Sequence, residues 1–207
     1  MRVLIFSALI VVVDQVTKLM VRGVSIPAFG IHVDGMHYGF SRPLIGNAVR
    51  LTYIENPGMA FGIDVGGKLF FSIFSLVASI AIVVYLYRAR HDAVGFRFSL
   101  AMILGGAVGN LIDRVFYGVI WGDGRFFYGR VVDFIDVDFF NFSVFGHQFS
   151  RWPVFNIADA AVTIGVILLL FFHRTAAAPE QGSLTPEIPP GGNTTTASEF
   201  SSKGTSE

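Results

Sequence analysis

Long apolar stretches alternate with polar connections along this chain, and they set the expected architecture. Four of them approach the roughly 20 helical residues that a bilayer core of about 30 Å requires. They run over about residues 3–21, 69–87, 96–112 and 154–172. The pattern predicts a mostly α-helical membrane protein, built as a bundle of four transmembrane helices.

The first apolar stretch is the least regular, because its uninterrupted run ends at Val13 and polar residues follow. A signal-peptide core is followed by similar residues, but no A-x-A cleavage site is present. The Lys18 side chain can extend its ammonium group toward the outer end of the helix. We therefore expect a retained helix and not a removed signal. Asp14 and Lys18 lie one turn apart and are expected to form a structural ion pair.

Basic residues near the ends of the apolar stretches indicate orientation, because cytoplasmic segments carry an excess of Lys and Arg. They precede the first stretch, separate the second from the third and follow the fourth: Arg2, Arg88, Arg90, Arg97 and Arg174. We expect both termini to be cytoplasmic. The two long connections, residues 22–68 and 115–153, would then lie together on the outer face, where the chemistry is expected.

The two outer connections differ in character. In the first, Val49, Leu51 and Tyr53 alternate with polar residues before an Asn-Pro-Gly sequence, which predicts a half-buried strand and a tight turn. The second connection is rich in aromatic residues, which fits a segment lying in the membrane interface; a simple aromatic belt is an equal alternative. Its aromatic residues are Phe116, Tyr117, Trp121, Phe126, Phe127, Tyr128, Phe134, Phe139, Phe140, Phe142, Phe145, Phe149 and Trp152.

Composition agrees with a membrane protein and excludes several kinds of chemistry. Of 207 residues, 53% are hydrophobic and 14% charged, with a mean hydropathy of +0.61, outside the usual range of soluble domains. The 15 basic and 15 acidic side chains balance, so nucleic acid is not expected as a partner. The absence of Cys excludes disulfides, thiolate metal sites and Cys nucleophiles. Residues 175–207 are rich in Ala, Pro, Gly, Ser and Thr, which predicts a disordered cytoplasmic tail after a membrane domain of residues 1–174.

Carboxylates inside strongly apolar sequence are costly and call for an explanation. Asn156, Asp159 and Thr163 share one face of the fourth predicted helix, and Asp159 lies about 7 Å below its start. At that depth it can meet an outer-loop residue while partly desolvated, which favours a functional role over a structural one. Asp133 is a second such carboxylate, and two of them suggest a shared site.

Polar and small residues also cluster on the third predicted helix. Asn110 and Arg114 lie one turn apart near its outer end, and Asp113 is within reach of Asn110 by spacing. A polar helix end with Arg114 at the headgroups is an equal alternative. Gly105 and Gly109 form a face that allows close helix packing.

The motifs, taken in order, resemble those of the lipoprotein signal peptidase family, also called signal peptidase II. They are DQVTK at 14–18, ENPGMAFG at 55–62, GGAVGNLIDR at 105–114, VVDFIDV at 131–137 and FNIADAAV at 155–162. Five motifs in order are far more specific than any one of them. Connections 115–130 and 138–153 look longer than is usual in the family.

The resemblance implies a bacterial inner-membrane aspartic endopeptidase that cleaves signal peptides from prolipoproteins, before a Cys that carries a diacylglyceryl group. It implies that Asp133 and Asp159 are the catalytic pair. The residues alone do not show which aspartate is the partner of Asp159, and leave Asp133, Asp136, Asp138 and Asp113 as candidates. It implies these substrate-contacting or site-shaping residues: Asn56, Gly58, Ala60, Phe61, Asn110, Arg114 and Asn156. An aspartate pair needs no metal or other cofactor. The expected partners are lipid-modified prolipoproteins and membrane lipid, and a monomer is favoured.

Two other classes of protein compete with this interpretation. In a small proton-coupled transporter or channel, Asp133 and Asp159 would relay protons and Arg114 would gate. In an assembly or scaffold protein, the polar residues would only join helices. The transporter is disfavoured because both aspartates lie toward one face of the membrane and form no path across it.

Overall fold

The computed structural model describes residues 2–60, 63–64, 67–121, 124–138, 142–144, 147–149 and 151–176. Its helical elements are α1 (Leu4–Arg22), the 3₁₀ turn η1 (Pro27–Phe29), α2 (Gly67–Arg88), α3 (Val94–Ile112), the π-helical turn η2 (Asp113–Tyr117), α4 (Gly118–Ile120) and α5 (Ile157–Ala176). Its strands are β1 (Val24–Ile26), β2 (Ile31–Val33), β3 (Ser41–Ile45), β4 (Val49–Asn56), β5 (Met59–Ala60), β6 (Ile63–Asp64), β7 (Val131–Val137), β8 (Phe142–Val144) and β9 (His147–Phe149).

Three helices in the described residues are long and apolar enough to cross a membrane, namely α1, α2 and the continuous helix Val94–Ile120. Helix α5 corresponds to the fourth predicted span, and its apolar part, Ile157–Phe172, is shorter. The prediction that the second outer connection starts at residue 115 is wrong. The π-helical turn η2 carries the third helix onward through α4 to Ile120, although the residue pattern becomes polar at Asp113.

Helix α3 is the centre of the bundle, since α1, α2 and α5 all pack against it. The predicted packing face of Gly105 and Gly109 is confirmed, and its partner is α1. A Cβ at Gly105 would lie 2.9 Å from Ile10 Cβ, and one at Gly109 would lie 2.7 Å from a carboxylate oxygen of Asp14. Only glycine at these positions lets α1 approach this closely.

Replacing Gly106 by alanine is expected to destabilise the protein by about 1–3 kcal/mol, as overpacking does. The added Cβ would lie 2.2 Å from the backbone oxygen of Ala158 in α5, and a backbone atom cannot rotate away. Thermal unfolding in detergent measures the effect. Gly124→Ala is the matched control, because its nearest neighbour would be 3.9 Å away. Equal melting temperatures for the two variants would contradict this account of the α3–α5 contact.

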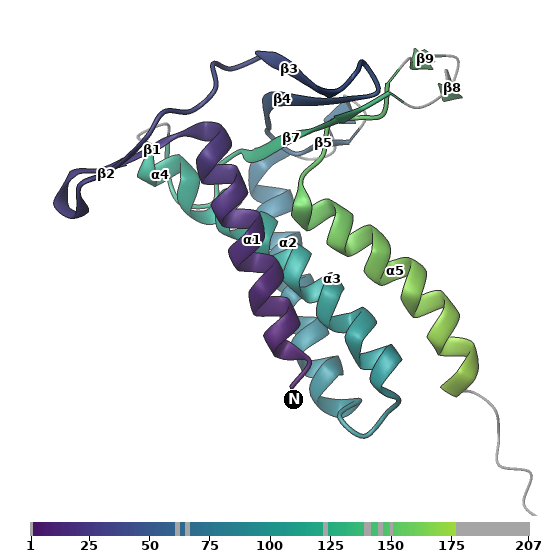
Figure 1. The fold of residues 1–207 in the computed structure, drawn as a ribbon. Coiled ribbons are helices and arrows are strands. Elements are labelled where there is room, and N and C mark those ends of the chain that lie inside the picture. Colours follow the sequence, from purple (N-terminus) through teal and green to yellow (C-terminus); the bar gives the residue numbers. More distant parts are fainter. Residues whose placement is uncertain are drawn as a thin grey trace, which may run out of the picture. The chain divides into compact units, whose positions relative to one another are not determined.

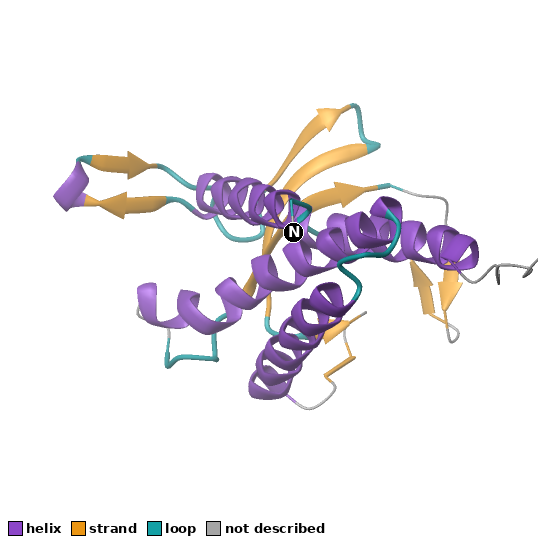
Figure 2. Ribbon diagram, turned by 90° about the horizontal axis from the view of Figure 1, so that it is seen from below, coloured by secondary structure: helices purple, strands orange, loops and turns teal. Residues whose placement is uncertain are grey.

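A three-stranded antiparallel sheet of order β3-β4-β7 lies at the end of the bundle where α1 ends and α5 begins (Figures 1 and 2). Strand β4 confirms the strand predicted around residues 49–53, and its central Tyr53 is buried. In the β4–β7 register, Ile54 pairs with Asp133, and Asn56 pairs with Val131. Asn56 is therefore a diagonal neighbour of Asp133 on one face of the sheet.

The sheet is joined to the helices by a small hydrophobic core that contains Val21, Tyr53, Tyr117, Val132 and Phe134. Tyr117 and Phe134 are 3% and 5% exposed, so the prediction that they face the membrane interface is wrong. They fill the junction because η2 and β7 both pack toward the end of α1.

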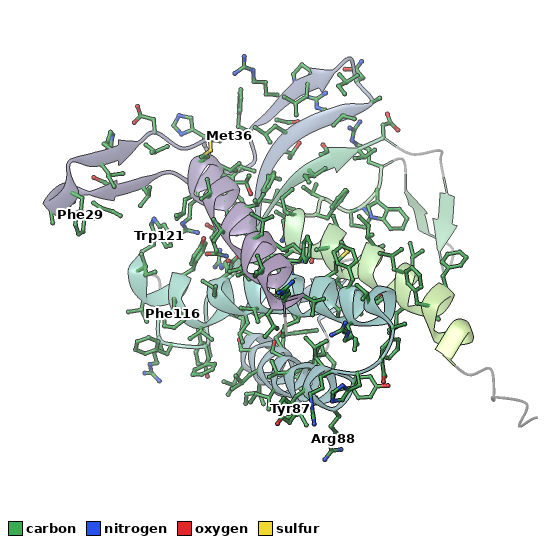
Figure 3. The ribbon with its side chains drawn as sticks, turned by 60° about the horizontal axis from the view of Figure 1, so that its bottom comes forward. Phe29, Met36, Tyr87, Arg88, Phe116 and Trp121 are labelled. Atoms are coloured by element: carbon green, nitrogen blue, oxygen red, sulfur yellow. The ribbon has the colours of Figure 1, made fainter. Side chains whose placement is uncertain are left out.

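Other aromatic side chains do point outward, as the interfacial prediction requires. Phe116 is 45% exposed on η2. Phe29, which lies in the first connection and was not part of that prediction, is 79% exposed at the end of the β1–β2 hairpin (Figure 3). Phe126, Tyr128 and Trp152 are also exposed. The side chains of residues 139–150 lie outside the described part, so the aromatic residues there stay predictions.

Candidate active site

Asp159 lies in the first turn of α5 and is held there by a reciprocal pair of hydrogen bonds. Its backbone N–H donates to Asn156 Oδ1 over 2.9 Å, and the Asn156 N–H donates to Asp159 Oδ2 over 3.3 Å. This arrangement is a capping box, in which the residue before the helix and the third residue inside it satisfy each other's backbone donors. The local sequence thus fixes where this carboxylate sits.

Asp133 reaches the same place from β7. Its side chain is 2% exposed, and its Oδ1 accepts a 2.7 Å hydrogen bond from Asn156 Nδ2. The amide of Asn56 is a further hydrogen-bond partner. Strand β7 is held against the start of α5 by a bridge between Ile135 and Phe155, which places Asp133 opposite the cap of that helix.

Two side-chain amides connect the carboxylates. Asn156 Nδ2, which binds Asp133, is also 3.1 Å from Asn110 Oδ1, and Asn110 Nδ2 donates to Asp159 Oδ1 over 2.7 Å. Asn110 comes from α3, Asn156 from the cap of α5 and Asp133 from β7. The structure therefore brings together four residues that the sequence places up to 49 positions apart.

Burial, and next the nearby carboxylate of Asp159, raises the pKa of Asp133 to about 8 from its ordinary value of 3.8. A carboxyl group in a poorly solvated site resists ionisation, and a neighbouring negative charge increases that resistance. With a pKa of about 8, the Asp133 carboxyl group keeps its proton at neutral pH. The pair can therefore offer an acid and a base together.

Asp159 is the more accessible of the two aspartates. It lines a cavity of about 290 Å³ together with Trp152, Phe155, Ala160, Thr163 and Ile164. Apart from the carboxylate and Thr163, this lining is largely apolar. A substrate segment of similar character could approach the pair from this side.

Arg114 faces the pair from η2. Its charge interacts with those of Asp113, Asp159 and Asp133, and its guanidinium donates long, 3.4 Å hydrogen bonds to Ser75 Oγ and to the Asn110 carbonyl. It is partly buried between α2 and α3. Ser75 was not identified from the sequence as its partner.

The Asn-Pro-Gly turn after β4 forms as predicted. Asn56 Oδ1 accepts a 2.9 Å hydrogen bond from the Gly58 N–H. Gly58 has a φ of 110°, which L side chains rarely adopt, and a Cβ there would lie 2.7 Å from the ring of Phe71. The backbone of Ala60 continues into β5, whereas Phe61 lies outside the described residues.

The predicted ion pair of Asp14 and Lys18 is confirmed, at 2.9 Å, but its setting differs from the expectation. Both side chains are fully buried, so Lys18 does not extend to the membrane surface. It also contacts Asp113, at 2.8 Å, and donates to Asn110 Oδ1 over 2.9 Å. Asp113 thus joins Asn110 through the Lys18 ammonium group.

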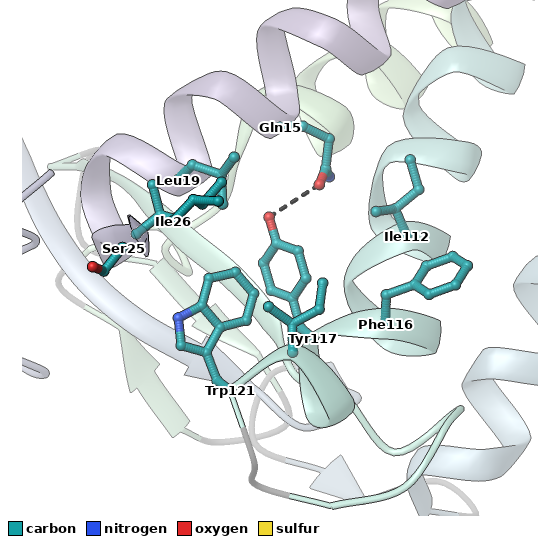
Figure 4. A pocket seen from close by; sticks show the side chains of 10 residues that line it. Gln15, Leu19, Ser25, Ile26, Ile112, Phe116, Tyr117 and Trp121 are labelled. Atoms are coloured by element: carbon teal, nitrogen blue, oxygen red, sulfur yellow. Dashed lines mark hydrogen bonds between the residues drawn. The ribbon is translucent and has the colours of Figure 1, made fainter. Parts of the chain in front are cut away.

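Gln15 was missed, although it connects several of these groups. Its amide donates to Asp113 Oδ1 over 2.8 Å, and its Oε1 accepts a 3.0 Å hydrogen bond from the Tyr117 hydroxyl (Figure 4). Both side chains line an apolar pocket of about 460 Å³ between α1 and η2. Its position directly after Asp14 was the only signal for Gln15 in the sequence.

The remaining candidate carboxylate on β7 has a different environment. Asp136 accepts hydrogen bonds of 2.7 Å from both Thr52 and Arg151, on the side of the sheet away from Asn156. Asp138 is within 3.3 Å of the same arginine. Within the described residues, no three His, Asp or Glu side chains gather as metal ligands would.

Comparisons with known proteins agree on one family. The family model described as signal peptidase (SPase) II matches residues 6–174. A lipoprotein signal peptidase of Chlorobium phaeobacteroides (strain DSM 266 / SMG 266 / 2430) is 34% identical over 169 residues, which cover 82% of this chain and 88% of the relative. One from Moorella thermoacetica is 37% identical over 180 residues, which cover 86% and 96%.

Two solved structures are similar in fold and sequence, and both are described as bacterial membrane enzymes. The first has a TM-score of 0.60 and 31% identity, and the match covers 87% of this chain and 92% of that one. The second has a TM-score of 0.58 and 32% identity, with 82% and 90% covered. All the residues placed around Asp133 and Asp159 lie inside the range that the family model matches.

Proposed function

Because this chain belongs to the signal peptidase II family, we propose that it is an aspartic endopeptidase acting within the membrane on diacylglyceryl-modified prolipoproteins. It removes the signal peptide by cutting before the lipidated Cys. The observation that carries the chemistry is the meeting of Asp133 and Asp159 around the amides of Asn110 and Asn156. Asp159 also lines a cavity through which a substrate could reach the pair.

In this mechanism Asp133 holds the proton, because it is the more buried carboxyl group, and Asp159 is the base that faces the cavity. Asp159 takes a proton from water as the water oxygen attacks the scissile carbonyl carbon. The Asp133 hydroxyl donates a hydrogen bond to the carbonyl oxygen and stabilises the negative charge that develops there. The C–N bond then breaks, and the leaving amine takes a proton from the pair.

The neighbouring side chains bind and shape the substrate. Asn56 and Gly58 shape the β4 side of the site, and Ala60 and Phe61 extend that wall. Arg114, which faces both carboxylates, binds carbonyl or ester oxygens of the lipidated substrate. No metal or other cofactor takes part, and the enzyme acts as a monomer.

The protein spans the bacterial inner membrane four times, with α5 as the fourth span. Arg88 and Arg97 lie at the α2–α3 turn, at the end of the bundle opposite the sheet (Figure 1). The excess of basic residues at that end supports cytoplasmic termini and an active site near the outer face. A proton-coupled transporter is not proposed, because both aspartates meet at one end of the spans.

Cleavage is expected to fall as the pH rises through about 8, the raised pKa of Asp133. The charged groups that face it are Asp159, Lys18 and Arg114. The active pair needs one proton, which is present below this pH and lost above it. The same shift makes folding less favourable as the pH rises from about 4 to about 8, because the folded protein then binds a proton that the unfolded chain has released.

The measurement is kcat/KM from about pH 5 to about pH 10, which spans the expected pKa. Melting temperatures at each pH are the control, because they separate loss of activity from unfolding. A flat profile through about pH 10 in a folded protein would contradict a protonated Asp133.

Two precursors test the proposed substrate. The purified full-length protein in detergent is given one prolipoprotein in two forms, with and without the diacylglyceryl group on its Cys. We expect cleavage of the lipidated form only, directly before the Cys, as read by mass spectrometry. Equal cleavage of the two forms would exclude lipid-dependent recognition, and cleavage of neither would exclude the proposed function.

A further inference from the structure

A buried ionic centre made of Asp14, Lys18 and Asp113 lies beside the aspartate pair. All three side chains are 0% exposed, and the ammonium nitrogen is 2.9 Å from Asp14 Oδ2 and 2.8 Å from Asp113 Oδ2. Replacing a buried ion cluster with apolar residues is often neutral or stabilising. Stability alone is therefore a weak reason for this cluster, and its other contacts suggest a second role.

Each carboxylate of the centre also accepts a backbone N–H from a segment that carries an active-site aspartate. Ala158 N–H donates to Asp14 Oδ1 over 3.0 Å, and Val132 N–H donates to Asp113 Oδ2 over 3.1 Å. Each of these amides belongs to the residue directly before one of the two active-site aspartates. The centre therefore holds the backbone of α5 and of β7 at once.

The ammonium group makes a third contact with the site. Lys18 Nζ donates to Asn110 Oδ1 over 2.9 Å. Because the ammonium group can only donate, this contact holds the oxygen of the Asn110 amide toward Lys18. The other end, Nδ2, then points at Asp159 Oδ1, 2.7 Å away. An unconstrained asparagine could turn its oxygen toward the carboxylate, which would be repulsive.

The orientation of Asp113 is itself constrained. Its second oxygen, Oδ1, accepts a 2.8 Å hydrogen bond from Gln15 Nε2, and Gln15 Oε1 is held by the Tyr117 hydroxyl at 3.0 Å. Both oxygens of Asp113 are thus occupied by fixed partners. Asp113 Oδ2, which accepts the Val132 N–H, therefore cannot rotate away without breaking these bonds.

We propose that Asp14, Lys18 and Asp113 are positioning residues, which set the separation and orientation of the Asp133 and Asp159 carboxyl groups. Asp14 acts on Asp159 through the Ala158 amide, and Asp113 acts on Asp133 through the Val132 amide. Lys18 links the two arms. This inference rests on the proposed function, because it concerns how well the pair performs its chemistry. A displacement of about 1 Å in an active site can cost about 100-fold in rate.

The experiment compares leucine with asparagine at each acidic position. Asp113→Leu and Asp14→Leu have nearly the same side-chain shape but no acceptor for the backbone amide. Asp113→Asn and Asp14→Asn lose the same charge but keep an oxygen that can accept. We expect kcat to fall about 100-fold in each leucine variant with KM unchanged, and to be largely restored in the asparagine variant at the same position.

Asp136 provides the matched control. It is a buried carboxylate, 6% exposed, on the same strand as Asp133, and its hydrogen-bond partners are Thr52 and Arg151. The Asp136→Leu and Asp136→Asn variants should have lower melting temperatures than the wild type. At temperatures well below melting, the two variants should have similar kcat values. The assays use lipidated precursor, and circular dichroism and melting curves in detergent identify folded variants.

The outcomes separate this inference from the proposed function. If the wild type cuts the precursor and folded leucine variants at Asp14 and Asp113 keep its kcat, the positioning role is wrong and the function stands. If leucine and asparagine variants lose kcat equally, charge alone matters and the positioning role is again wrong. If a leucine variant does not fold, a serine variant at the same position replaces it, because the serine hydroxyl is too short to reach the backbone amide. We expect the serine variant to lose kcat to the same extent. A wild-type kcat in that variant would overturn the inference.

Discussion

Asp159→Asn and Asp133→Asn are each expected to lower cleavage of a lipidated precursor by about 100- to 10,000-fold, the range that general acid and base catalysis typically contributes. An amide at Asp159 cannot take a proton from water. An amide at Asp133 can still donate a hydrogen bond but cannot supply a proton to the pair. Both changes preserve shape, and each keeps an oxygen that can accept from Asn110 or Asn156.

Asp136→Asn is the control for this result, because it removes a carboxylate from the same strand without touching the amides of Asn110 and Asn156. Cleavage by this variant should stay close to that of the wild type. Single-turnover rates with purified protein, together with melting curves, give the comparison. Near-normal turnover in either active-site variant would rule out a mechanism that needs both aspartates.

Lys18→Met is expected to lower the free energy of unfolding by about 3–5 kcal/mol, the usual cost of removing one partner from a buried ion pair. Its ammonium group is fully buried between two carboxylates, at 2.9 and 2.8 Å. Methionine fills similar space but leaves two buried negative charges unpaired and facing each other. Chemical denaturation in detergent, monitored by circular dichroism, measures the change.

A neutral triple variant shows whether unpaired charge causes the loss. Adding Asp14→Asn and Asp113→Asn to Lys18→Met removes both stranded carboxylates, so much of the stability should return. The surface-exposed arginine Arg130, with its side chain 50% exposed and 3.7 Å from Glu55, gives a matched comparison. Its methionine variant should change stability by less than about 1 kcal/mol, and an equally small effect at Lys18 would contradict the importance of burial.

Much of the helical fold follows from local sequence. The apolar stretches predicted α1, α2, α3 and α5 to within a few residues, apart from the continuation of the third helix. That continuation through η2 was not predictable from hydropathy, because Asp113 looks like a helix end until its partners are known. Those partners, Lys18 and the Val132 amide, come from segments far away in the sequence.

Composition and short periodic patterns were enough to predict the membrane class, the strand at β4 and the place of Asp159 in a first helical turn. The folded structure selects Asp133 as the carboxylate that joins Asp159, a choice that the residues alone left open. Alternate residues of a strand point to opposite faces, so Asp133 reaches Asn156 while Asp136, three residues later, reaches Arg151. It also decided that Lys18 is buried, since an isolated helix would send the ammonium group to water, whereas α3 supplies Asp113 to pair with it.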